Sequence, residues 1–276
     1  MAGTLFVVAT PIGNLEDITF RAVRVLREVG VVAAEDTRRT GQLLRHFGIP
    51  TRLVSLHRHN ESLRSEAVVS RLRGGTSVAL VTDAGTPGIS DPGARLVAAA
   101  VAAGLRVEPV PGCSALTTAL SVAGLEADVA SFMGFPPVRG KPRNEWFDRL
   151  DLLAGEGVVA FFEAPHRMRT ALEELHKRSY SQIVVLRELT KLHESAYRGA
   201  PYEILVQLGE PVGEFVIVVP QVRREQASVA TVDEAAVIDK FGQITGTKTR
   251  EAARIVARSM GISPNRVYEI VSRRKD

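Results

Sequence analysis

Short runs of hydrophobic residues alternate with amphipathic stretches along the first part of the chain. The hydrophobic pattern predicts buried strands at residues 5–9, 31–34, 77–81 and 106–110. Between these runs, hydrophobic residues recur at helical spacing over residues 18–29, 37–47, 62–72 and 94–103. This alternation of strand and helix predicts a mainly parallel sheet covered by helices.

A second α/β pattern follows a helix of small residues at 114–122. Its predicted strands are residues 129–133, 158–162, 183–186 and 215–219, and its predicted helices are 144–153 and 166–177. We therefore predict an α/β protein with two α/β domains, residues 1–123 and 124–222. A polar linker at 221–231 then leads to amphipathic segments at 232–241, 249–260 and 264–273, which predict a small helical module over residues 223–276.

Composition narrows the class of protein. With 45% hydrophobic and 24% charged residues, the chain of 276 residues is expected to be globular. Its longest hydrophobic run, residues 96–105, is far shorter than the roughly 20 residues that span a bilayer. No leader pattern is visible at the N-terminus, so we expect a water-soluble, cytoplasmic protein. One cysteine excludes internal disulfides and cysteine-based zinc sites, and the scattered histidines predict no metal site.

The charge is unevenly distributed. Residues 223–276 contain 11 Lys and Arg against 7 Asp and Glu, whereas residues 1–222 contain 24 of each. The whole formal net charge of +4 therefore lies in the tail. This asymmetry indicates a basic module that meets a polyanion.

Three loops at predicted strand ends are rich in turn residues: 10–14, 82–93 and 111–115. Open parallel sheets bind ligands at this edge, and small residues allow the backbone to approach a ligand closely. An alternative for the second loop is a tight turn in which Asp91 caps the next helix and Pro92 is its first residue. The chain has no dinucleotide-binding glycine fingerprint and no P-loop.

An ordered set of short motifs carries a family resemblance. The motifs are Thr10–Leu15 (TPIGNL), Glu35–Arg38 (EDTR), Asp83–Pro87 (DAGTP), Pro111-Gly112, Gly134-Phe135, Glu163–Arg167 (EAPHR) and Gly213–Phe215 (GEF). Together they resemble the small-subunit ribosomal RNA 2′-O-ribose methyltransferase I family of the tetrapyrrole-methylase superfamily. The resemblance covers residues 4–222, and the family is also expected to carry a tail.

The resemblance implies S-adenosylmethionine bound in a cleft between two α/β domains. It also implies methyl transfer to the 2′-hydroxyl of a cytidine near the decoding centre of 16S rRNA, and assembly as a homodimer. The cofactor-binding positions that it implies are Pro11, Asp83, Ala84, Gly85, Ile89, Ser114, Ala115, Phe162, Leu189 and Phe215.

A ribose hydroxyl is a poor nucleophile, so a proton acceptor should assist its methylation. The candidates are Glu163, His166, Asp36 and Asp91, and we favour Glu163 or His166 because both lie at a strand end that should face the cleft. Each has a structural alternative. Glu163 can pair with Arg167 four residues later, His166 can be a polar residue at a helix start, and Asp36 can cap a helix.

Candidate RNA contacts are arginines of the body and of the tail. The body contributes Arg38, Arg58 and Arg167, and the tail contributes Arg250, Arg254, Arg258 and Arg266. Ala257, Gly261 and Val267 fall at the relative positions expected of a helix-turn-helix. The alternative is a small helical bundle that packs on the body or on a second copy, with solvated arginines.

Two other functions remain open from the sequence. The same fold could methylate a tetrapyrrole-type small molecule, which needs no basic tail. The chain could instead be a regulator that senses a ligand with its body and binds DNA with its tail.

Overall fold

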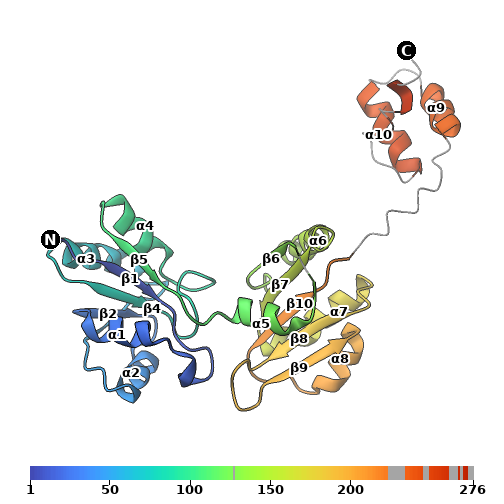
Figure 1. The fold of residues 1–276 in the computed structure, drawn as a ribbon. Coiled ribbons are helices and arrows are strands. Elements are labelled where there is room, and N and C mark those ends of the chain that lie inside the picture. The colour runs from blue at the N-terminus through green and yellow to red at the C-terminus, as the bar shows by residue number, and fades with distance from the viewer. Residues whose placement is uncertain (127, 223–233, 245–248, 261–266, 268–269, 273–276) are drawn as a thin grey trace. The chain divides into compact units, whose positions relative to one another are not determined.

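A computed structural model describes residues 1–126, 128–222, 234–244, 249–260, 267 and 270–272 (Figure 1). The chain forms two compact units, Met1–Val222 and Arg223–Asp276. The first unit contains two five-stranded sheets.

The first sheet is entirely parallel, with the strand order β3-β2-β4-β1-β5. Its strands are β1 (Leu5–Val8), β2 (Val31–Ala34), β3 (Leu53–Ser55), β4 (Val78–Val81) and β5 (Val107–Val110). The helices between them are α1 (Phe20–Glu28), α2 (Thr37–His46), α3 (Glu61–Arg73) and α4 (Ala94–Ala102). Because β4, β1 and β5 are neighbours, the three turn-rich loops that follow them leave the sheet at one edge.

The second sheet is mixed, with the order β6-β7-β10-β8-β9. Its strands are β6 (Ala130–Phe132), β7 (Val158–Glu163), β8 (Ile183–Arg187), β9 (Ser195–Gly199) and β10 (Phe215–Val219). Only β6 and β7 pair in parallel, and the other three pairings are antiparallel. The associated helices are α5 (Ala115–Ala123), α6 (Lys141–Ala154), α7 (Met168–Lys177) and α8 (Pro201–Leu208).

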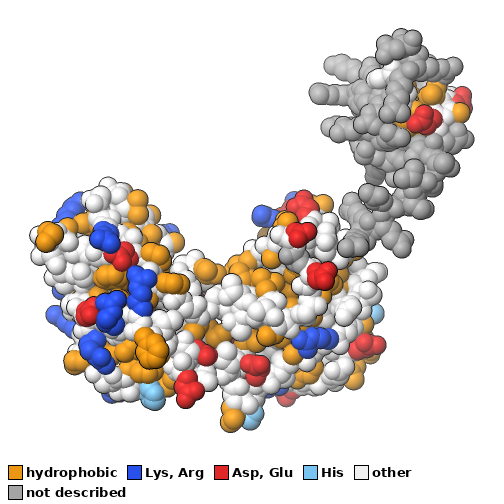
Figure 2. All heavy atoms as spheres, in the orientation of Figure 1, with side chains coloured by type: hydrophobic (Ala, Val, Ile, Leu, Met, Phe, Trp, Pro, Cys, Tyr) orange, Lys and Arg blue, Asp and Glu red, His pale blue; other side chains and the backbone are white. Residues whose placement is uncertain are grey.

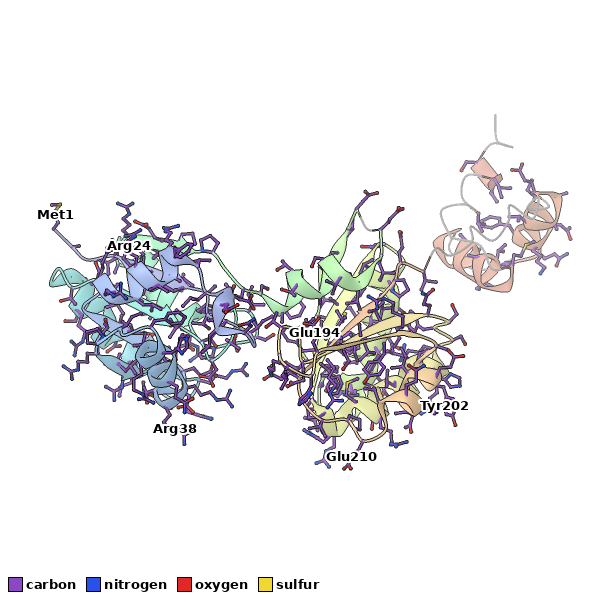
Figure 3. The ribbon with its side chains drawn as sticks, turned by 60° about the horizontal axis from the view of Figure 1, so that its bottom comes forward. Met1, Arg24, Arg38, Glu194, Tyr202 and Glu210 are labelled. Carbon is purple, nitrogen blue, oxygen red and sulfur yellow. The ribbon has the colours of Figure 1, made fainter. Side chains whose placement is uncertain are left out.

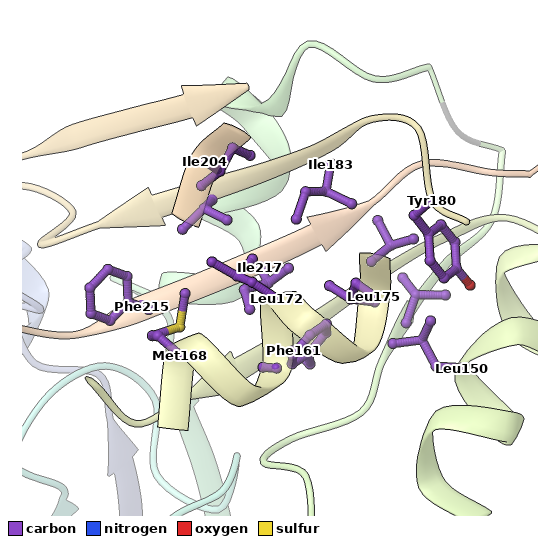
Figure 4. Packing of buried hydrophobic residues seen from close by; sticks show 14 of the residues in the cluster. Leu150, Phe161, Met168, Leu172, Leu175, Tyr180, Ile183, Ile204, Phe215 and Ile217 are labelled. Atoms are coloured by element: carbon purple, nitrogen blue, oxygen red, sulfur yellow. The ribbon is translucent and has the colours of Figure 1, made fainter. Parts of the chain in front are cut away.

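Each face of the second sheet has its own hydrophobic core. On one face, Phe161 and Ile217 pack with Met168 and Leu172 of α7, and all four side chains are fully buried (Figure 4). On the other face, Ala119 and Ala123 of α5 pack against the sheet, together with side chains of the strand-end loops. Alternation along the strands places these two sets on opposite faces.

The predicted architecture is confirmed. Each strand predicted from the hydrophobic runs is present, and α10 (Thr249–Met260) has the predicted bounds. The pattern missed β3, β9 and α8. The division into domains after residues 123 and 222 stays a prediction, and we note that α5 packs on the second sheet rather than the first.

The C-terminal unit contains α9 (Glu234–Gln243) and α10. Val237 of α9 packs with Val256 and Ala257 of α10, and with Val267, in a small buried core. Two of the predicted helix-turn-helix positions, Ala257 and Val267, thus belong to one core, while Gly261 and Arg266 lie outside the described residues. In the described part of the chain, no helix is long and apolar enough to cross a bilayer.

Candidate functional site

A cavity of about 350 Å³ lies in the first unit and is lined from both sheets. Its volume is within the range of small-molecule sites, and most of its wall is apolar. The first sheet contributes the loop after β4, and the second contributes the ends of β7 and β10. The lining residues are Ile12, Ala84–Thr86, Ile89–Asp91, Ser114, Ala115, Phe135, Phe162–Pro165, Leu189 and Gly213–Val216.

The loops that form the wall are linked to one another. Thr10 and Gly85 exchange two backbone hydrogen bonds of 2.9 and 3.0 Å, which join the first loop to the second. The Thr86 hydroxyl donates to the Cys113 carbonyl at 3.1 Å, which joins the second loop to the third. These bonds connect the three loops to one another.

Glycine is required where the first loop meets the second sheet domain. A Cβ on Gly13 would lie 2.5 Å from Lys191 Cγ and 2.7 Å from the Leu189 carbonyl oxygen. The next residue, Asn14, donates its N–H to the Thr190 hydroxyl at 3.1 Å. The TPIGN motif therefore fixes the loop of one domain against a loop of the other.

The structure brings together eight of the ten predicted cofactor residues. They line the same cavity: Ala84, Gly85, Ile89, Ser114, Ala115, Phe162, Leu189 and Phe215. Most of these side chains are small or apolar, so a ligand here would be held mainly by shape and by backbone groups. Their role in binding stays a prediction.

Pro11 and Asp83 lie outside the lining of this cavity. Both line a different hollow, next to Arg39 and His46 of α2. The Asp83 carboxylate accepts a hydrogen bond of 3.0 Å from the Asp36 N–H and lies 3.6 Å from the Arg39 guanidinium. Burial raises the pKa of Asp83 above its ordinary value. Asp83 thus ties the β4 loop to the start of α2.

Glu163 lines the cavity, but its carboxylate is already occupied. Its side chain is fully buried, with Oε2 3.3 Å from Arg143 Nη2 and Oε1 2.9 Å from Arg167 Nε. Oε1 also accepts the N–H of Ala164 at 2.8 Å. The ion pair with Arg167 is the structural alternative set out above.

His166 lies in the 3-10 turn Pro165–Arg167 and is exposed. Its neighbours Ala164 and Pro165 line the cavity, whereas His166 is not among the lining residues. The assignment of Glu163 or His166 as proton acceptor stays a prediction.

Asp91 also lines the cavity, and it does not cap α4. The cap residue of α4 is Gly93, and the carboxylate at the start of this helix comes from the buried Glu61. Glu61 Oε1 accepts the N–H groups of Gly93 and Arg95 at 2.9 and 3.0 Å. The capping alternative for Asp91 is therefore wrong, because another side chain occupies that position.

Asp36 is the cap of α2. Its carboxylate accepts the Arg38 N–H at 2.8 Å and pairs with the Arg38 guanidinium at 2.7 Å. The hydrogen bond from the Arg38 side chain holds the pKa of Asp36 well below its usual value. Asp36 therefore has the structural role that the sequence left open.

The body arginines differ in accessibility. Arg38 is 88% exposed and extends from the surface of the first sheet domain (Figure 3). Arg58 is exposed and donates to the Ser90 carbonyl at the edge of the cavity. Arg167 is only 17% exposed and donates to the Pro136 carbonyl at 3.1 Å, so its guanidinium is committed to the fold. In α10, the side chains of Arg250, Arg254 and Arg258 lie outside the described residues.

Several lining residues were not among the predicted site residues, and three of them are Ile12, Phe135 and Glu214. Each lies within a motif of the family resemblance, and that position was the only signal available. The 49% exposed Phe135 packs on Phe162 with 5.4 Å between ring centroids. Among the described residues, no group of three or more His, Cys, Asp or Glu side chains is placed to hold a metal ion.

Comparison with known proteins finds relatives that match most of this chain. Positions 4–204 match the family model of Tetrapyrrole (Corrin/Porphyrin) Methylases. A Ribosomal RNA small subunit methyltransferase I from Pseudomonas aeruginosa is 42% identical over 97% of this chain and 96% of its own length. The proteins of the same name from Halalkalibacterium halodurans and Escherichia coli O157:H7 are 38% and 40% identical, each over 97% of this chain and 94% of their own length.

Two solved structures share the fold at lower sequence identity. A uroporphyrin-III-C-methyltransferase from Thermus thermophilus aligns with a TM-score of 0.56 at 21% identity, over 80% of this chain and 96% of that one. A diphthine synthase aligns with a TM-score of 0.61 at 18% identity, over 79% of this chain and 90% of that one. The two-sheet fold and the cavity at the strand-end loops agree with these matches. Because the relatives are 38–42% identical over nearly all of their length, the chain belongs to the ribosomal RNA small subunit methyltransferase I family of the tetrapyrrole methylases.

Proposed function

We propose that this protein uses S-adenosylmethionine to methylate the ribose 2′-hydroxyl of a cytidine in 16S rRNA, near the decoding centre. The observation that carries the proposal is the single cavity into which the motif loops of both sheet domains converge. The family supplies the reaction class, and the cavity supplies a place for it.

The lining fits the cofactor. Ala84, Gly85 and Ala115 leave room for a ligand to approach the backbone, and Phe162 and Leu189 offer apolar contact to an adenosine. Ser114 precedes α5, whose first N–H groups suit a carboxylate such as that of the methionine moiety. The acidic Asp91 and Glu214 suit its positive charge. When bound there, S-adenosylmethionine supplies an electrophilic methyl group.

The surroundings of the cavity suit a nucleotide substrate. Phe135 presents a half-exposed ring, and aromatic rings are common platforms for unstacked RNA bases. Arg58 lies at the same edge through its bond to Ser90. In Figure 2, Lys and Arg side chains gather over the face of the first sheet domain that the view presents. Such contacts position an RNA backbone without reading its sequence.

The basic tail suits an RNA substrate better than a small one. Binding of a tetrapyrrole substrate would not explain the surplus of four positive charges in residues 223–276. The substrate is proposed to be the small ribosomal subunit or its 16S rRNA, which places the reaction in the cytoplasm. We also propose that the protein forms a homodimer. Exposed apolar side chains such as Phe20 and Leu192, which are 97% and 92% exposed, are available for its interface.

The test is methyl transfer in a defined mixture. Purified protein, S-adenosylmethionine with a labelled methyl group and unmodified small subunits should yield one labelled ribose in 16S rRNA. Parallel reactions with a porphyrinoid precursor, and mobility shifts with duplex DNA, test the two rival functions. Label in the porphyrinoid and none in rRNA would overturn the proposal.

A further inference from the structure

One loop of the second sheet domain combines an exposed aromatic ring with positive charge at the edge of the cavity. Residues 134–143 run from the end of β6 into the first turn of α6, and they include three basic residues and no acidic one. Phe135, Arg139 and Lys141 are exposed, and Phe135 also lines the cavity. Arg139 follows Phe135 by four residues, so their Cα atoms are at most about 14 Å apart. The ring and the charges can therefore meet the same short stretch of a ligand.

The Phe135 ring extends a row of aromatic side chains from the sheet to the surface. Phe132 packs on Phe162 with 4.9 Å between ring centroids, and Phe162 packs on Phe135 with 5.4 Å. Phe135 is 49% exposed, whereas the other two rings are partly buried. Part of the Phe135 ring thus rests on the cavity wall and the remainder is open to solvent, which is an arrangement that allows an unstacked base to stack on it.

The backbone of this loop is fixed by the two arginines that pair with Glu163. Arg167 Nη1 donates to the Pro136 carbonyl at 3.1 Å, and Arg143 Nη1 donates to the Pro137 carbonyl at 2.9 Å. Both guanidinium groups meet the buried Glu163 carboxylate, and the two prolines restrict their own φ angles. A loop that is held in place before its ligand arrives loses little conformational entropy when the ligand binds.

The same ion pairs leave positive charge in excess. One carboxylate, that of Glu163, faces two guanidinium groups, and within the described part of the chain no other carboxylate lies within 4.0 Å of Arg143 or Arg167. Lys141 lies 3.6 Å from Glu145, but both side chains are mostly exposed, and such a pair is weak. The loop therefore offers uncompensated positive charge, which suits the phosphates of a polyanion.

We infer that the segment Phe135–Lys141 receives a single-stranded stretch of the substrate RNA at the edge of the cavity, an inference that deepens the proposed function and rests on it. Phe135 stacks on an unpaired base, and Arg139 and Lys141 bind the phosphates next to that base. Stacking tolerates every base, and phosphate contacts carry no sequence information. This surface therefore positions the strand beside the cavity wall and leaves the choice of nucleotide to other contacts.

The test separates the ring from the charges. Phe135→Leu keeps an apolar side chain but removes the aromatic face, and Phe135→Tyr restores that face. The double variant Arg139→Gln/Lys141→Gln removes both charges. Its matched control is Arg149→Gln/Lys177→Gln, which removes the same two charges from exposed positions on α6 and α7 that do not line the cavity.

Three quantities are measured for each variant. The first is the dissociation constant for unmodified small subunits, from filter binding between about 50 and 200 mM salt. The second is the single-turnover rate of methyl transfer when the subunits and S-adenosylmethionine are both saturating. The third is the calorimetric dissociation constant of S-adenosylmethionine, which reports whether a variant still folds around the cavity.

We expect Phe135→Leu to weaken subunit binding about fivefold or more, and Phe135→Tyr to recover most of that loss. The double variant Arg139→Gln/Lys141→Gln should bind subunits more weakly and lower the slope of log affinity against log salt by about 1.4, or about 0.7 for each phosphate contact to a single strand. The control Arg149→Gln/Lys177→Gln should keep the wild-type affinity and slope.

The inference is overturned if the double variant at Arg139 and Lys141 keeps the affinity and slope of its control, or if Phe135→Leu binds subunits and transfers methyl groups as the wild type does. A loss in Phe135→Leu that only equals its loss of cofactor affinity also overturns it. Should Phe135→Leu fold poorly, the double variant decides, because its two side chains are exposed. Wild-type protein that leaves the subunits unmethylated refutes the proposed function itself.

Discussion

Arg143 of α6 and Glu163 at the end of β7 form a buried ion pair in the wall of the cavity, with 3.3 Å between Nη2 and Oε2. Their side chains are 8% and 0% exposed, and Arg143 also donates to the Pro137 carbonyl at 2.9 Å. Arg167 approaches the other carboxylate oxygen and binds the Pro136 carbonyl. One carboxylate therefore holds two arginines, and these arginines in turn hold the loop that follows Phe135 through the carbonyls of Pro136 and Pro137.

Removing this carboxylate should destabilise the fold. Glu163→Ala leaves two buried guanidinium groups without their partner, and we expect a loss of about 3–5 kcal/mol in the free energy of unfolding. Denaturant unfolding followed by circular dichroism measures it. The control is Glu28→Ala, because Glu28 pairs with Arg24 at the surface, where both side chains are 59% exposed, and such pairs contribute about 0.5 kcal/mol or less. Equal effects of the two substitutions would contradict the account of Glu163.

The pKa of Asp91 gives stability a specific pH dependence. Because the folded pKa of about 6 exceeds the unfolded value of 3.8, the native state binds the proton more tightly, and stability falls as pH rises from about 4 to 6. Above pH 6 this loss in the free energy of unfolding is complete, and it amounts to about 1–2 kcal/mol after allowance for solvent screening. Asp91→Asn should therefore be more stable than the wild type at pH 7.5 and lose this advantage at pH 4. Thermal unfolding at the two pH values checks the prediction, and an unchanged difference between them would contradict it.

Filling the cavity should block the cofactor. Ala84→Leu adds three carbons to a lining position, and we expect S-adenosylmethionine to bind at least about tenfold more weakly, since even a modest clash of about 1.4 kcal/mol has that effect. Isothermal titration calorimetry gives the dissociation constant. Ala98→Leu makes the same change on the exposed face of α4 and should leave affinity as it is. Normal binding by Ala84→Leu would show that the cofactor lies elsewhere.

The tail should act on RNA and not on the cofactor. A chain that ends at Val222 retains both sheets and the whole cavity lining. We expect it to bind S-adenosylmethionine normally, to bind small subunits more weakly, and to show a shallower dependence of affinity on salt because fewer phosphates are neutralised. Filter binding between about 50 and 200 mM salt measures both quantities. Unchanged affinity and salt dependence would assign the tail a packing role.

Much of the fold could be predicted because its signals are local. β1, β2 and β4 are continuous apolar runs, as expected of strands inside a parallel sheet that is covered on both faces. β3 was missed because it has three residues, and β9 because Ser195–Gly199 lies at an edge and its side chains are only partly buried. Neither provides enough hydrophobic pattern to detect.

The candidate site was harder to predict because its chemistry depends on contacts distant in sequence. Asp91 fitted a helix-capping pattern, and only the structure shows that Glu61, thirty residues earlier, occupies that role. Asp83 belongs to a motif of the loop but turns toward Asp36 and Arg39 of another element. Local sequence could place these carboxylates at a strand end, but the direction of each side chain is set by tertiary packing.

The most direct test of the account is a map of the 2′-O-methylated riboses of 16S rRNA by mass spectrometry. The RNA would come from a strain that lacks this gene, from the same strain complemented with the wild type, and from one complemented with Ala84→Leu. We predict that one methylated cytidine near the decoding centre is absent from the deletion strain, is restored by the wild type and is not restored by Ala84→Leu. Identical maps from the deletion strain and the wild-type complement would contradict the proposed function.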